Sequence, residues 1–246
     1  MSKKVLIIQH SSGVRPAYVT EFFAQHQIPF QILHIYDPEC ELDLPDCQTT
    51  DYLAIVSLGG PQGTYEDGEY PYLKWEKSFL AAQLALETPI LGLCLGAQLL
   101  ADVIGGHGHL GKYGYEVGYV QHTLTQEGKQ DPIFSKLFEE QENEPLLIMH
   151  HQDSFDLPPE ASLLAYTSNN YKAAFRFGSA YAVQFHPEAS FTEFNEWVQR
   201  KLAKQPAAYK DLDIDEILRQ ARENEPKAKK SRRLFFETWW NLISKA

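Results

Sequence analysis

The stretch from Pro89 to Ile104 reads Pro-Ile-Leu-Gly-Leu-Cys-Leu-Gly-Ala-Gln-Leu-Leu-Ala-Asp-Val-Ile and holds the most informative motif of this chain. Its first five residues form an apolar run that predicts a strand, and Ala97–Ile104 predicts a helix. Cys94 lies between them, two positions after Gly92 and two positions before Gly96. Glycine suits a tight turn in which backbone approaches backbone. The order of strand, sharp turn and helix therefore predicts a nucleophile elbow with Cys94 at the turn.

The predicted position of Cys94 also favours reactivity. Free N–H groups and the helix dipole at a helix N-terminus stabilise a thiolate relative to a thiol. The alternative is that Cys94 only fills the core, because free cysteine is among the most buried residue types. The pentapeptide alone does not decide between the two interpretations. A base and an oxyanion hole elsewhere in the chain would favour the first.

Composition limits the classes of protein to consider. The 246 residues are 43% hydrophobic and 22% charged, an ordinary globular composition, and the chain is long enough for one large α/β domain plus an appendage. Three cysteines (Cys40, Cys47 and Cys94) do not suggest a disulfide scaffold, so we expect a reduced, cytoplasmic setting. We find no apolar run of signal-peptide or membrane-spanning length and expect no membrane association. The net charge of −11 argues against general nucleic-acid binding.

Short apolar strands alternate with helices in the first hundred residues. The expected strands are Val5–Gln9, Phe30–Tyr36, Tyr52–Leu58 and Pro89–Leu93, and the expected helices are Arg15–His26 and Tyr72–Leu86. This alternation predicts parallel strands joined by helical crossovers. Continuous apolar runs such as Leu53–Leu58 suit strands that are covered on both faces.

The pattern changes from about Tyr115, where strands follow one another with few helices between them. The expected strands are Val117–Leu124, Pro145–Met149, Ser162–Thr167, Ala173–Phe177 and Tyr181–Phe185, and Phe191–Leu202 is an expected helix. Short connections favour antiparallel pairing at one side of the sheet. The predicted fold class is therefore α/β, with an open, mostly parallel sheet, helices on both faces, an antiparallel extension and a C-terminal helical tail.

The tail differs from the rest of the chain in its charge. Residues 205–246 carry a net charge of +2 and residues 1–204 a net charge of −13. We therefore expect an α/β domain over 1–204 and a helical extension over 205–246. Asp213–Arg222 predicts one helix, and residues 234–243 predict an amphipathic helix with a heavy aromatic face. We favour packing of this face on its own domain, with a partner or dimer surface as the alternative, and we interpret the basic residues 227–233 as a solvated helix start.

A second motif supplies a candidate base. His186-Pro187-Glu188 follows the predicted strand Tyr181–Phe185. Residues two apart in an extended backbone point to the same side, so His186 and Glu188 can project toward one place. A nucleophile needs a base, and the base needs a group that orients it and stabilises its charged form. Alone, the motif would usually be a solvated strand end.

A third motif supplies a candidate oxyanion hole. Gly59-Gly60-Pro61 follows a predicted parallel strand, so it is expected at the same carboxyl edge of the sheet as Cys94. Glycines there allow backbone N–H groups to approach a ligand, although Gly-Gly-Pro is also an ordinary turn. The functional interpretation is an oxyanion hole formed with the N–H of Leu95, the residue after the nucleophile.

Together and in this order, the three motifs resemble the type I (triad) glutamine amidotransferases, with the greatest similarity to the stand-alone, GMP-synthase-like group. The resemblance covers roughly residues 1–200. Further matching segments are Ala97-Gln98, Leu99-Leu100-Ala101, Gly105-Gly106, Glu116-Val117-Gly118-Tyr119 and His150-His151-Gln152-Asp153. The family often has Ser-His-Gly-Asp at the last of these, so this chain departs from the pattern at positions 150 and 152. The chain contains no ATP-pyrophosphatase or other synthetase motif.

The resemblance implies glutamine hydrolysis through a γ-glutamyl thioester. Cys94 is the implied nucleophile, His186 the proton shuttle and Glu188 its orienting group, with the N–H groups of Gly60 and Leu95 as the oxyanion hole. The resemblance also implies substrate contacts from Gln98, Gln152 and Asp153. We expect no cofactor and no metal, because His107-Gly108-His109 and His150-His151 lack further ligands in the sequence, and we interpret these histidines as loop residues.

Other functions remain open on the sequence alone. The same triad could hydrolyse other γ-glutamyl amides, such as γ-glutamyl peptides. The chain could instead be an idle binding or regulatory module whose tail helix is the working surface. A non-amidotransferase relative with the same elbow is a weaker alternative. The ammonia acceptor is unknown, and the expected partners are the small-molecule substrate and either a synthetase or a second copy bound through the C-terminal helix.

Overall fold

The N-terminal half forms parallel strands, as predicted. In this computed structural model, which describes residues 3–37, 39, 44–142 and 144–245, strand β1 (Lys4–Gln9) pairs in parallel with β2 (Phe30–His34) and β3 (Tyr52–Ser57). Strand β4 (Ile90–Leu93) pairs in parallel with β3, and Val56 lies opposite Leu91. Cys40, one of the three cysteines of the sequence, lies outside the residues that the structure describes.

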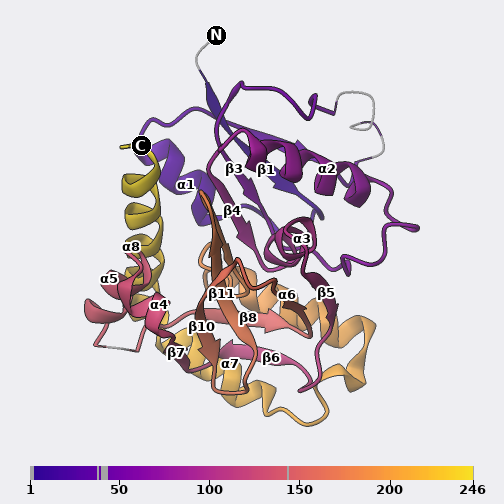
Figure 1. The fold of residues 1–246 in the computed structure, drawn as a ribbon. Helices are drawn as coiled ribbons and strands as arrows, with labels where there is room; N and C mark the ends of the chain where they lie inside the picture. The colour runs from indigo at the N-terminus through magenta and orange to yellow at the C-terminus, as the bar shows by residue number, and fades with distance from the viewer. Residues whose placement is uncertain (1–2, 38, 40–43, 143, 246) are drawn as a thin grey trace.

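The sheet continues with an antiparallel extension on the other side of β4. Strand β12 (Ala180–Val183) runs parallel to β4, whereas β11 (Lys172–Phe177), β10 (Ser162–Thr167) and β7 (His122–Leu124) are antiparallel to their neighbours. The order across the eight-stranded sheet is β2-β1-β3-β4-β12-β11-β10-β7. The predicted fold class is confirmed. Figure 1 shows the sheet with helices on both of its faces.

Side chains of β1 alternate between two cores. Val5 and Ile7 face the core that contains α1 (Tyr18–Gln25), α5 (Phe134–Glu139) and α8 (Glu225–Ile243). Leu6 and Ile8 face the core that contains α2 (Tyr72–Ala85) and α3 (Leu95–Val103). All four side chains are fully buried, as expected for a strand that is covered on both faces.

Two small sheets flank the main one, and here the prediction of a single strand over Val117–Leu124 is wrong. Strand β6 (Glu116–Tyr119) pairs with β8 (Ile148–His151), whereas β7 belongs to the main sheet. Gly118 has a φ of +91°, which a regular strand does not adopt, and the chain changes sheets just after it. The second small sheet pairs β5 (His107–Leu110) with β9 (Asp153–Asp156).

The histidines that we interpreted as loop residues lie in strands. His107 and His109 belong to β5, and His150 and His151 end β8. The predicted strand Pro145–Met149 begins later, at Ile148, and continues through both histidines. The short helix α4 (Gln126–Gln130) and α5 were not predicted. Thr125 begins α4 by accepting a hydrogen bond from the backbone of Gly128.

The C-terminal segment folds back on the same chain. Helix α6 (Phe191–Lys204) begins with a Ser190–Glu193 capping box and is followed by the 3-10 helix η2 (Pro206–Tyr209) and by α7 (Ile214–Glu223). Helices α6 and α7 and strands β6 and β8 share a third core. The division at residue 204 stays a prediction from composition.

The last helix, α8, covers the sheet rather than offering its aromatic face to solvent. Phe235, Phe236 and Trp239 are fully buried in the core they share with α1 and α5. Figure 1 shows α8 beside α1 at the edge of the molecule. The favoured packing on its own domain is confirmed for these residues. The interpretation of residues 227–233 as a solvated helix start is wrong for Arg232, which is only 6% exposed.

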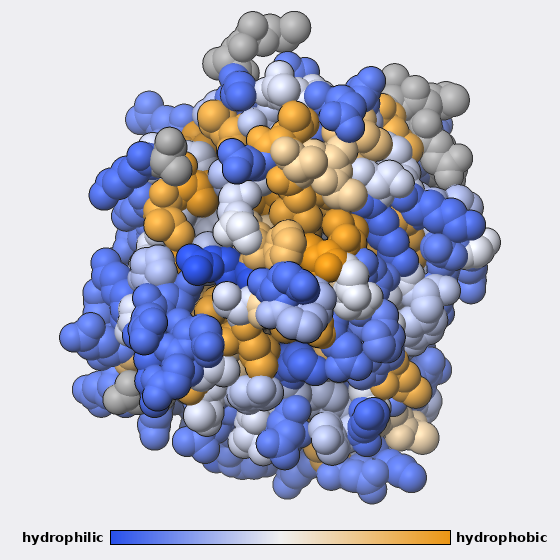
Figure 2. All heavy atoms as spheres, in the orientation of Figure 1, coloured by the Kyte–Doolittle hydropathy of each residue, from blue (hydrophilic) through white to orange (hydrophobic). Residues whose placement is uncertain are grey.

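The surface is largely hydrophilic on the face that Figure 2 draws. Figure 2 shows one face on which hydrophilic residues cover most of the lower half, and hydrophobic residues gather near the centre of the upper half. No helix among the described residues is long and apolar enough to cross a membrane.

Candidate active site

Cys94 occupies the sharp turn between β4 and α3. Its backbone has φ 52° and ψ −102°, a combination that a residue with a side chain rarely adopts. The backbone N–H of Cys94 donates to Val183 O at 2.8 Å, which fixes the turn against β12. Such local strain persists only where the surrounding structure enforces it, and it concentrates at functional sites.

Both glycines of the elbow are required by close backbone approaches. A Cβ on Gly92 would lie 2.6 Å from the carbonyl oxygen of Gly96, and a Cβ on Gly96 would overlap the backbone of Ser57. The backbone N–H of Gly96 donates to Leu58 O at 3.1 Å. The glycine spacing therefore lets α3 begin directly against the ends of β3 and β4.

His186 and Glu188 contact each other just beyond β12. The ring nitrogen Nδ1 of His186 lies 2.8 Å from Oε1 of Glu188, and the two residues are 4% and 1% exposed. The His186 ring packs on Trp197 of α6, with ring centroids 4.6 Å apart. The backbone N–H of His186 donates to Ile148 O at 2.8 Å. The imidazole is thus held by a carboxylate at Nδ1 and by contact with a tilted indole.

The charges around His186 favour its protonated form. Burial alone would lower the pKa of this imidazole. The negative charges of Glu188 and of a Cys94 thiolate act in the opposite direction, and the net effect raises the pKa of His186 above its usual value. The arrangement therefore favours an imidazolium beside Cys94.

The loop Gly59-Gly60 lies against both the elbow and His186. A Cβ on Gly59 would be 2.8 Å from Cε1 of His186 and 3.5 Å from Cβ of Cys94. A Cβ on Gly60 would be 2.7 Å from the side chain of Leu95. Within the described part of the chain, no protein acceptor is bonded to the backbone N–H of Gly60 or of Leu95. Both donors are therefore available beside Cys94.

A buried cluster of three polar side chains, which was not predicted from the sequence, contacts this loop. Glu76 of α2 lies 2.6 Å from Nε2 of His10 and accepts a hydrogen bond from Ser57 Oγ at 2.7 Å. Nδ1 of His10 lies 3.4 Å from Gly59 O, and all three polar side chains are fully buried. Glu76 could have been found, because it falls on the apolar face of the predicted helix with Leu73 and Phe79.

A cavity of about 280 Å³ opens beside Cys94. Its lining includes Gly60, His150, His186 and Trp197, together with three cationic residues of α6. Gln98, Gln152 and Asp153, which we predicted as substrate contacts, do not line it. The cavity therefore lies on the His186 side of the sulfur.

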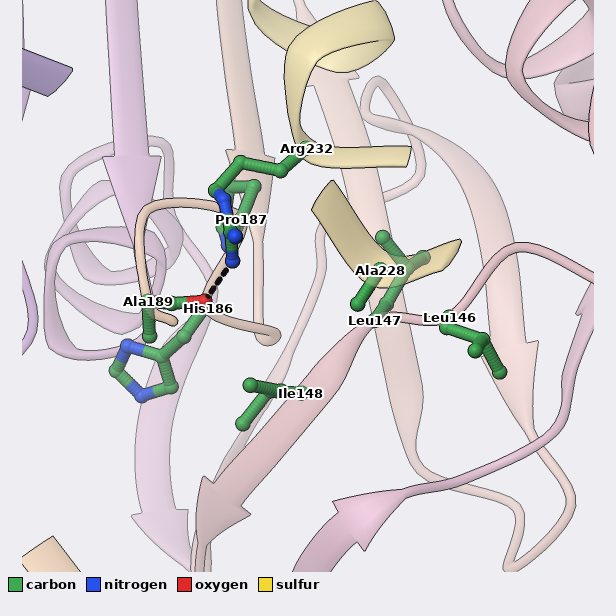
Figure 3. Close-up of a pocket in the computed structure, with 8 residues that line it drawn as sticks. All are labelled: Leu146, Leu147, Ile148, His186, Pro187, Ala189, Ala228 and Arg232. Carbon is green, nitrogen blue, oxygen red and sulfur yellow. Dashed lines mark hydrogen bonds between the residues drawn. The ribbon is translucent and has the colours of Figure 1, made fainter. Parts of the chain in front are cut away.

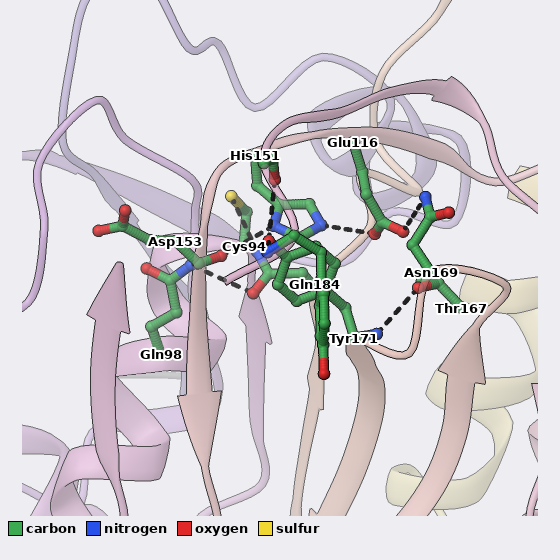
Figure 4. A network of polar contacts seen from close by, with 11 residues as sticks. Cys94, Gln98, Glu116, His151, Asp153, Thr167, Asn169, Tyr171 and Gln184 are labelled. Carbon is green, nitrogen blue, oxygen red and sulfur yellow. Dashed lines mark hydrogen bonds and ion pairs between the residues drawn. The ribbon is translucent and has the colours of Figure 1, made fainter. Parts of the chain in front are cut away.

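Gln98 instead belongs to a polar network on the other side of the elbow (Figure 4). Its amide Nε2 donates to Oε1 of Gln184 at 3.1 Å and to the backbone oxygen of Asp153 at 3.2 Å. Gln184 in turn donates to the Cys94 sulfur at 3.4 Å. Gln184 was not predicted, although a fully buried glutamine in the apolar run Tyr181–Phe185 is unusual and was the available signal.

Comparison with known proteins identifies the family. Residues 20–205 match the family "Glutamine amidotransferase class-I". The chain belongs to this family. It is 32% identical over 178 residues to the glutamine-hydrolyzing GMP synthase of Thermus thermophilus, an alignment that covers 69% of this chain and 32% of that protein. It is 34% identical over 119 residues to a protein of Natronomonas pharaonis named as one subunit of a glutamine-hydrolyzing GMP synthase, covering 48% of this chain and 61% of that protein.

A solved structure extends the likeness over the whole chain. A glutamine amidotransferase from Thermotoga maritima superposes with a TM-score of 0.79 and 27% identity, covering 100% of both chains. The chain spans about a third of the length of the Thermus synthase and under two thirds of the Natronomonas protein. The resemblance inferred from the motifs is confirmed at the level of the family.

The predicted substrate loop contributes His151 to a third buried histidine and carboxylate pair, with Glu116 of β6, visible in Figure 4. Nε2 of His151 lies 2.9 Å from Glu116, and Nδ1 lies 2.8 Å from the backbone oxygen of Asp153. Burial would raise the pKa of Glu116, but the hydrogen bond and charge of His151, with a hydrogen bond from Asn169, hold it below its usual range. The pair fixes the backbone that accepts a hydrogen bond from Gln98.

The other two predicted substrate residues, Asp153 and Gln152, make different contacts. Asp153 accepts a hydrogen bond from Tyr65 at 2.9 Å, and burial raises the pKa of its carboxyl. Gln152 accepts a hydrogen bond from Gly111 through its backbone oxygen at 3.0 Å. Their roles toward glutamine stay predictions.

The C-terminal helix α8 reaches the segment that follows His186 and Glu188. Arg232 of α8 donates to the backbone oxygen of Ala189 and is paired with Glu225. Figure 3 shows this contact beside His186 and Pro187, in a small hollow that also contains Ala228. The tail therefore helps to fix the backbone that follows His186 and Glu188.

One histidine cluster lies away from the site. Ligand atoms of His107, His109 and Asp156 lie within 4.8 Å of one another, so Asp156 supplies a third group that the local sequence motif lacks. Asp156 is already paired with Lys172 at 2.8 Å, and its pKa is lowered mainly by that hydrogen bond. The expectation that no metal takes part in the chemistry stays a prediction.

Proposed function

We propose that this chain hydrolyses the side-chain amide of glutamine, the glutaminase half-reaction of an amidotransferase, with Cys94, His186 and Glu188 as its catalytic triad. The observation that carries the proposal is that the strained elbow cysteine and a carboxylate-bound histidine line one cavity. The GMP synthases that the chain resembles are named as glutamine-hydrolyzing, which supports the same chemistry here.

In the first half of the reaction, the Cys94 thiolate attacks the carbonyl carbon of the side-chain amide. The negative charge that develops on the carbonyl oxygen is held by the N–H groups of Gly60 and Leu95. The imidazolium of His186 gives its proton to the departing nitrogen as the carbon–nitrogen bond breaks. Ammonia leaves, and a γ-glutamyl thioester remains on the sulfur.

In the second half, water attacks the thioester. Neutral His186 accepts a proton from the water, the carbon–sulfur bond breaks, and glutamate leaves with the thiolate and imidazolium restored. Glu188 keeps Nδ1 of His186 hydrogen-bonded throughout, which orients the ring and stabilises its positive charge. In this proposal Gln98, Gln152 and Asp153 bind the amino-acid end of glutamine.

The ammonia goes to an acceptor that we leave unassigned. The similarity to a protein named as one subunit of GMP synthase supports delivery to a separate synthetase. Dimerisation through α8 has less support, because its aromatic residues Phe235 and Trp239 are buried in their own chain. The cytoplasmic setting stays a prediction.

A second candidate activity is hydrolysis of γ-glutamyl peptides with the same triad. The cavity beside His186 favours it, because a volume of about 280 Å³ is larger than departing ammonia requires. An idle binding module has less support, because all three triad positions are filled and His186 and Glu188 are in contact.

The test compares ammonia release from glutamine by the wild-type chain and by C94A and C47S. Cys47 is the matched control, since it is a described cysteine outside the cavity. The proposal expects activity in the wild type and in C47S and none in C94A. Equal activity in C94A and the wild type would exclude Cys94 as the nucleophile.

A further inference from the structure

We propose that the cavity beside Cys94 is a subsite for an anionic leaving group, so that the preferred substrate is a γ-glutamyl amide whose amine part carries a carboxylate. This inference rests on the proposed triad chemistry and names the substrate class of that site. It commits to amines such as amino acids or short peptides.

The position of the cavity relative to the triad assigns it to the leaving group. The departing nitrogen must receive its proton from His186, so any substituent on that nitrogen extends on the His186 side of the sulfur. The cavity lies on this side and is lined by His186 and Trp197. Gln98 and Asp153, the proposed contacts for the glutamyl part, lie outside it. The two ends of a γ-glutamyl amide would therefore occupy different sides of Cys94.

The charges of the cavity select the kind of substituent. Arg200, Lys201 and Lys204 all line it, and no aspartate or glutamate does. Among the described residues, none of these three cations has a carboxylate within 4.0 Å. Arg15, by contrast, is paired with Glu193 and Glu196 of the same helix. In a chain with a net charge of −11, three uncompensated cations at one cavity attract an anion.

Two contacts hold Arg200 and Lys201 against the rim of the cavity. The guanidinium of Arg200 packs on Gly13, where an added Cβ would overlap it. Lys201 lies over the ring of Tyr115, 5.1 Å from the centroid. Lys201 and Lys204 also lie in the last turn of α6, where cations stabilise the helix. That effect accounts for their charge but does not require that they line the cavity with Cys94.

The charge of Lys201 contributes to the electrostatic environment of His150, which also lines the cavity. Burial, followed by the charges of His186, His151 and Lys201, lowers the pKa of His150 to about 3. His150 is therefore neutral at pH 7, and its Nε2 lies 2.7 Å from the hydroxyl of Tyr209. His150 therefore adds no charge to the cavity, and a carboxylate there would meet the cations of α6.

The reaction balances as hydrolysis. The γ-glutamyl carbon–nitrogen bond breaks, His186 protonates the departing amine, and water then releases glutamate from Cys94. The products are glutamate and the free amine, whose carboxylate stays ionised throughout. The cations contribute to binding and orientation of the amine part and take no proton.

Two substrates that differ only in the charge of the amine part test the proposal. We expect the wild-type chain to hydrolyse γ-glutamylglycine with a kcat/KM about 10-fold or more above that of γ-glutamylglycinamide, both measured by glutamate release. In the variant R200Q/K201Q/K204Q this ratio is expected to fall to about 1, with the single variant K204Q intermediate. The matched control K74Q removes an exposed lysine of α2 and is expected to keep the wild-type ratio.

The outcomes separate this inference from the proposed function. Equal hydrolysis of both compounds by the wild type, or an unchanged ratio in R200Q/K201Q/K204Q, would overturn the subsite while Cys94 chemistry stands. If the triple variant fails to fold, the wild-type ratio and K204Q decide. Glutamate release from neither compound nor from glutamine, or release that survives in C94A, would overturn the proposed function itself.

Discussion

The side-chain amide of Gln184 donates a hydrogen bond to the sulfur of Cys94 at 3.4 Å. The two residues are 90 positions apart in the chain, and Gln184 is fully buried. Its oxygen accepts a hydrogen bond from Gln98, so the donor amide is directed toward the sulfur. The polar network beneath the elbow thus ends at the proposed nucleophile.

Replacing Gln184 by leucine removes a donor to the thiolate. Hydrogen bonds to charged groups contribute about 1.5–3 kcal/mol, so we expect Q184L to slow alkylation of Cys94 by iodoacetamide at pH 7 by about 10-fold. The control is Q83L, which removes another fully buried glutamine that donates to backbone oxygens of Cys47 and Thr49. Equal alkylation rates in Q184L and the wild type would contradict the proposed effect on the sulfur.

Replacing Gly59 by alanine introduces a methyl group 2.8 Å from Cε1 of His186. The imidazole must move, and misplacement by about 1 Å can lower a rate by about 100-fold. We expect G59A to lose most of its glutamine hydrolysis and to keep a cooperative unfolding transition near that of the wild type. G68A is the control, because no atom lies within 4 Å of a Cβ at Gly68. Full activity in G59A would show that the position of His186 is not critical.

Replacing Glu76 by leucine leaves His10 and Ser57 without their buried partner. Removal of one member of a buried ion pair or hydrogen-bonded pair costs about 3–5 kcal/mol, so we expect E76L to lower the free energy of unfolding by about 3 kcal/mol in urea titrations. E21L, at an exposed position of α1, is expected to change it by less than about 0.5 kcal/mol. A change of similar size in both variants would argue against a structural role for the buried group.

Two histidines, the buried His122 and the half-buried His150, make the fold sensitive to mild acid. Burial is the main cause that lowers the pKa of His122 to about 4 and that of His150 to about 3. Between these pKa values and about pH 6.5, the unfolded chain therefore binds more protons at these two histidines than the folded chain does. Their contribution to stability falls as the pH falls through that window. Each histidine is expected to cost about 2 kcal/mol at pH 5 relative to pH 8.

The variant H122L tests this pH dependence. Both ring nitrogens of His122 are buried without a partner among the described residues. The variant should lack the part of the acid sensitivity that comes from His122, about 2 kcal/mol between pH 7 and pH 5 in urea titrations. His186 opposes this trend above about pH 6, because its raised pKa keeps it protonated in the folded chain while the unfolded chain loses this proton as the pH rises through about 6.5. An unchanged pH dependence in H122L would contradict the assignment.

The parts of the site that the sequence predicted depend on local patterns. The spacing of Gly92, Cys94 and Gly96 follows from the steric needs of one turn, and His186 and Glu188 are close because they are two residues apart. Glu76 was open to prediction from helical spacing. Gln184 reaches Cys94 only because β12 and β4 are neighbours, a pairing between segments far apart in the chain.

The errors in the fold have the same origin. The apolar pattern over Val117–Leu124 continues across a change of sheet, and only long-range pairing shows that β6 and β7 have different partners. Arg232 looked solvated because it lies among lysines, yet the packing of α8 turns it toward Ala189. Local periodicity predicts that an element exists, whereas its neighbours are set by tertiary packing.

The most direct test of the central claim is covalent labelling of Cys94. The probe is a glutamine analogue with a chloromethyl ketone in place of the side-chain amide, and the labelled residue is located by peptide mass spectrometry. We predict stoichiometric label on Cys94, none on Cys47, and slower labelling in H186A, because His186 stabilises the thiolate. Absence of label on Cys94 in the folded wild-type chain would contradict the proposal that Cys94 is the nucleophile.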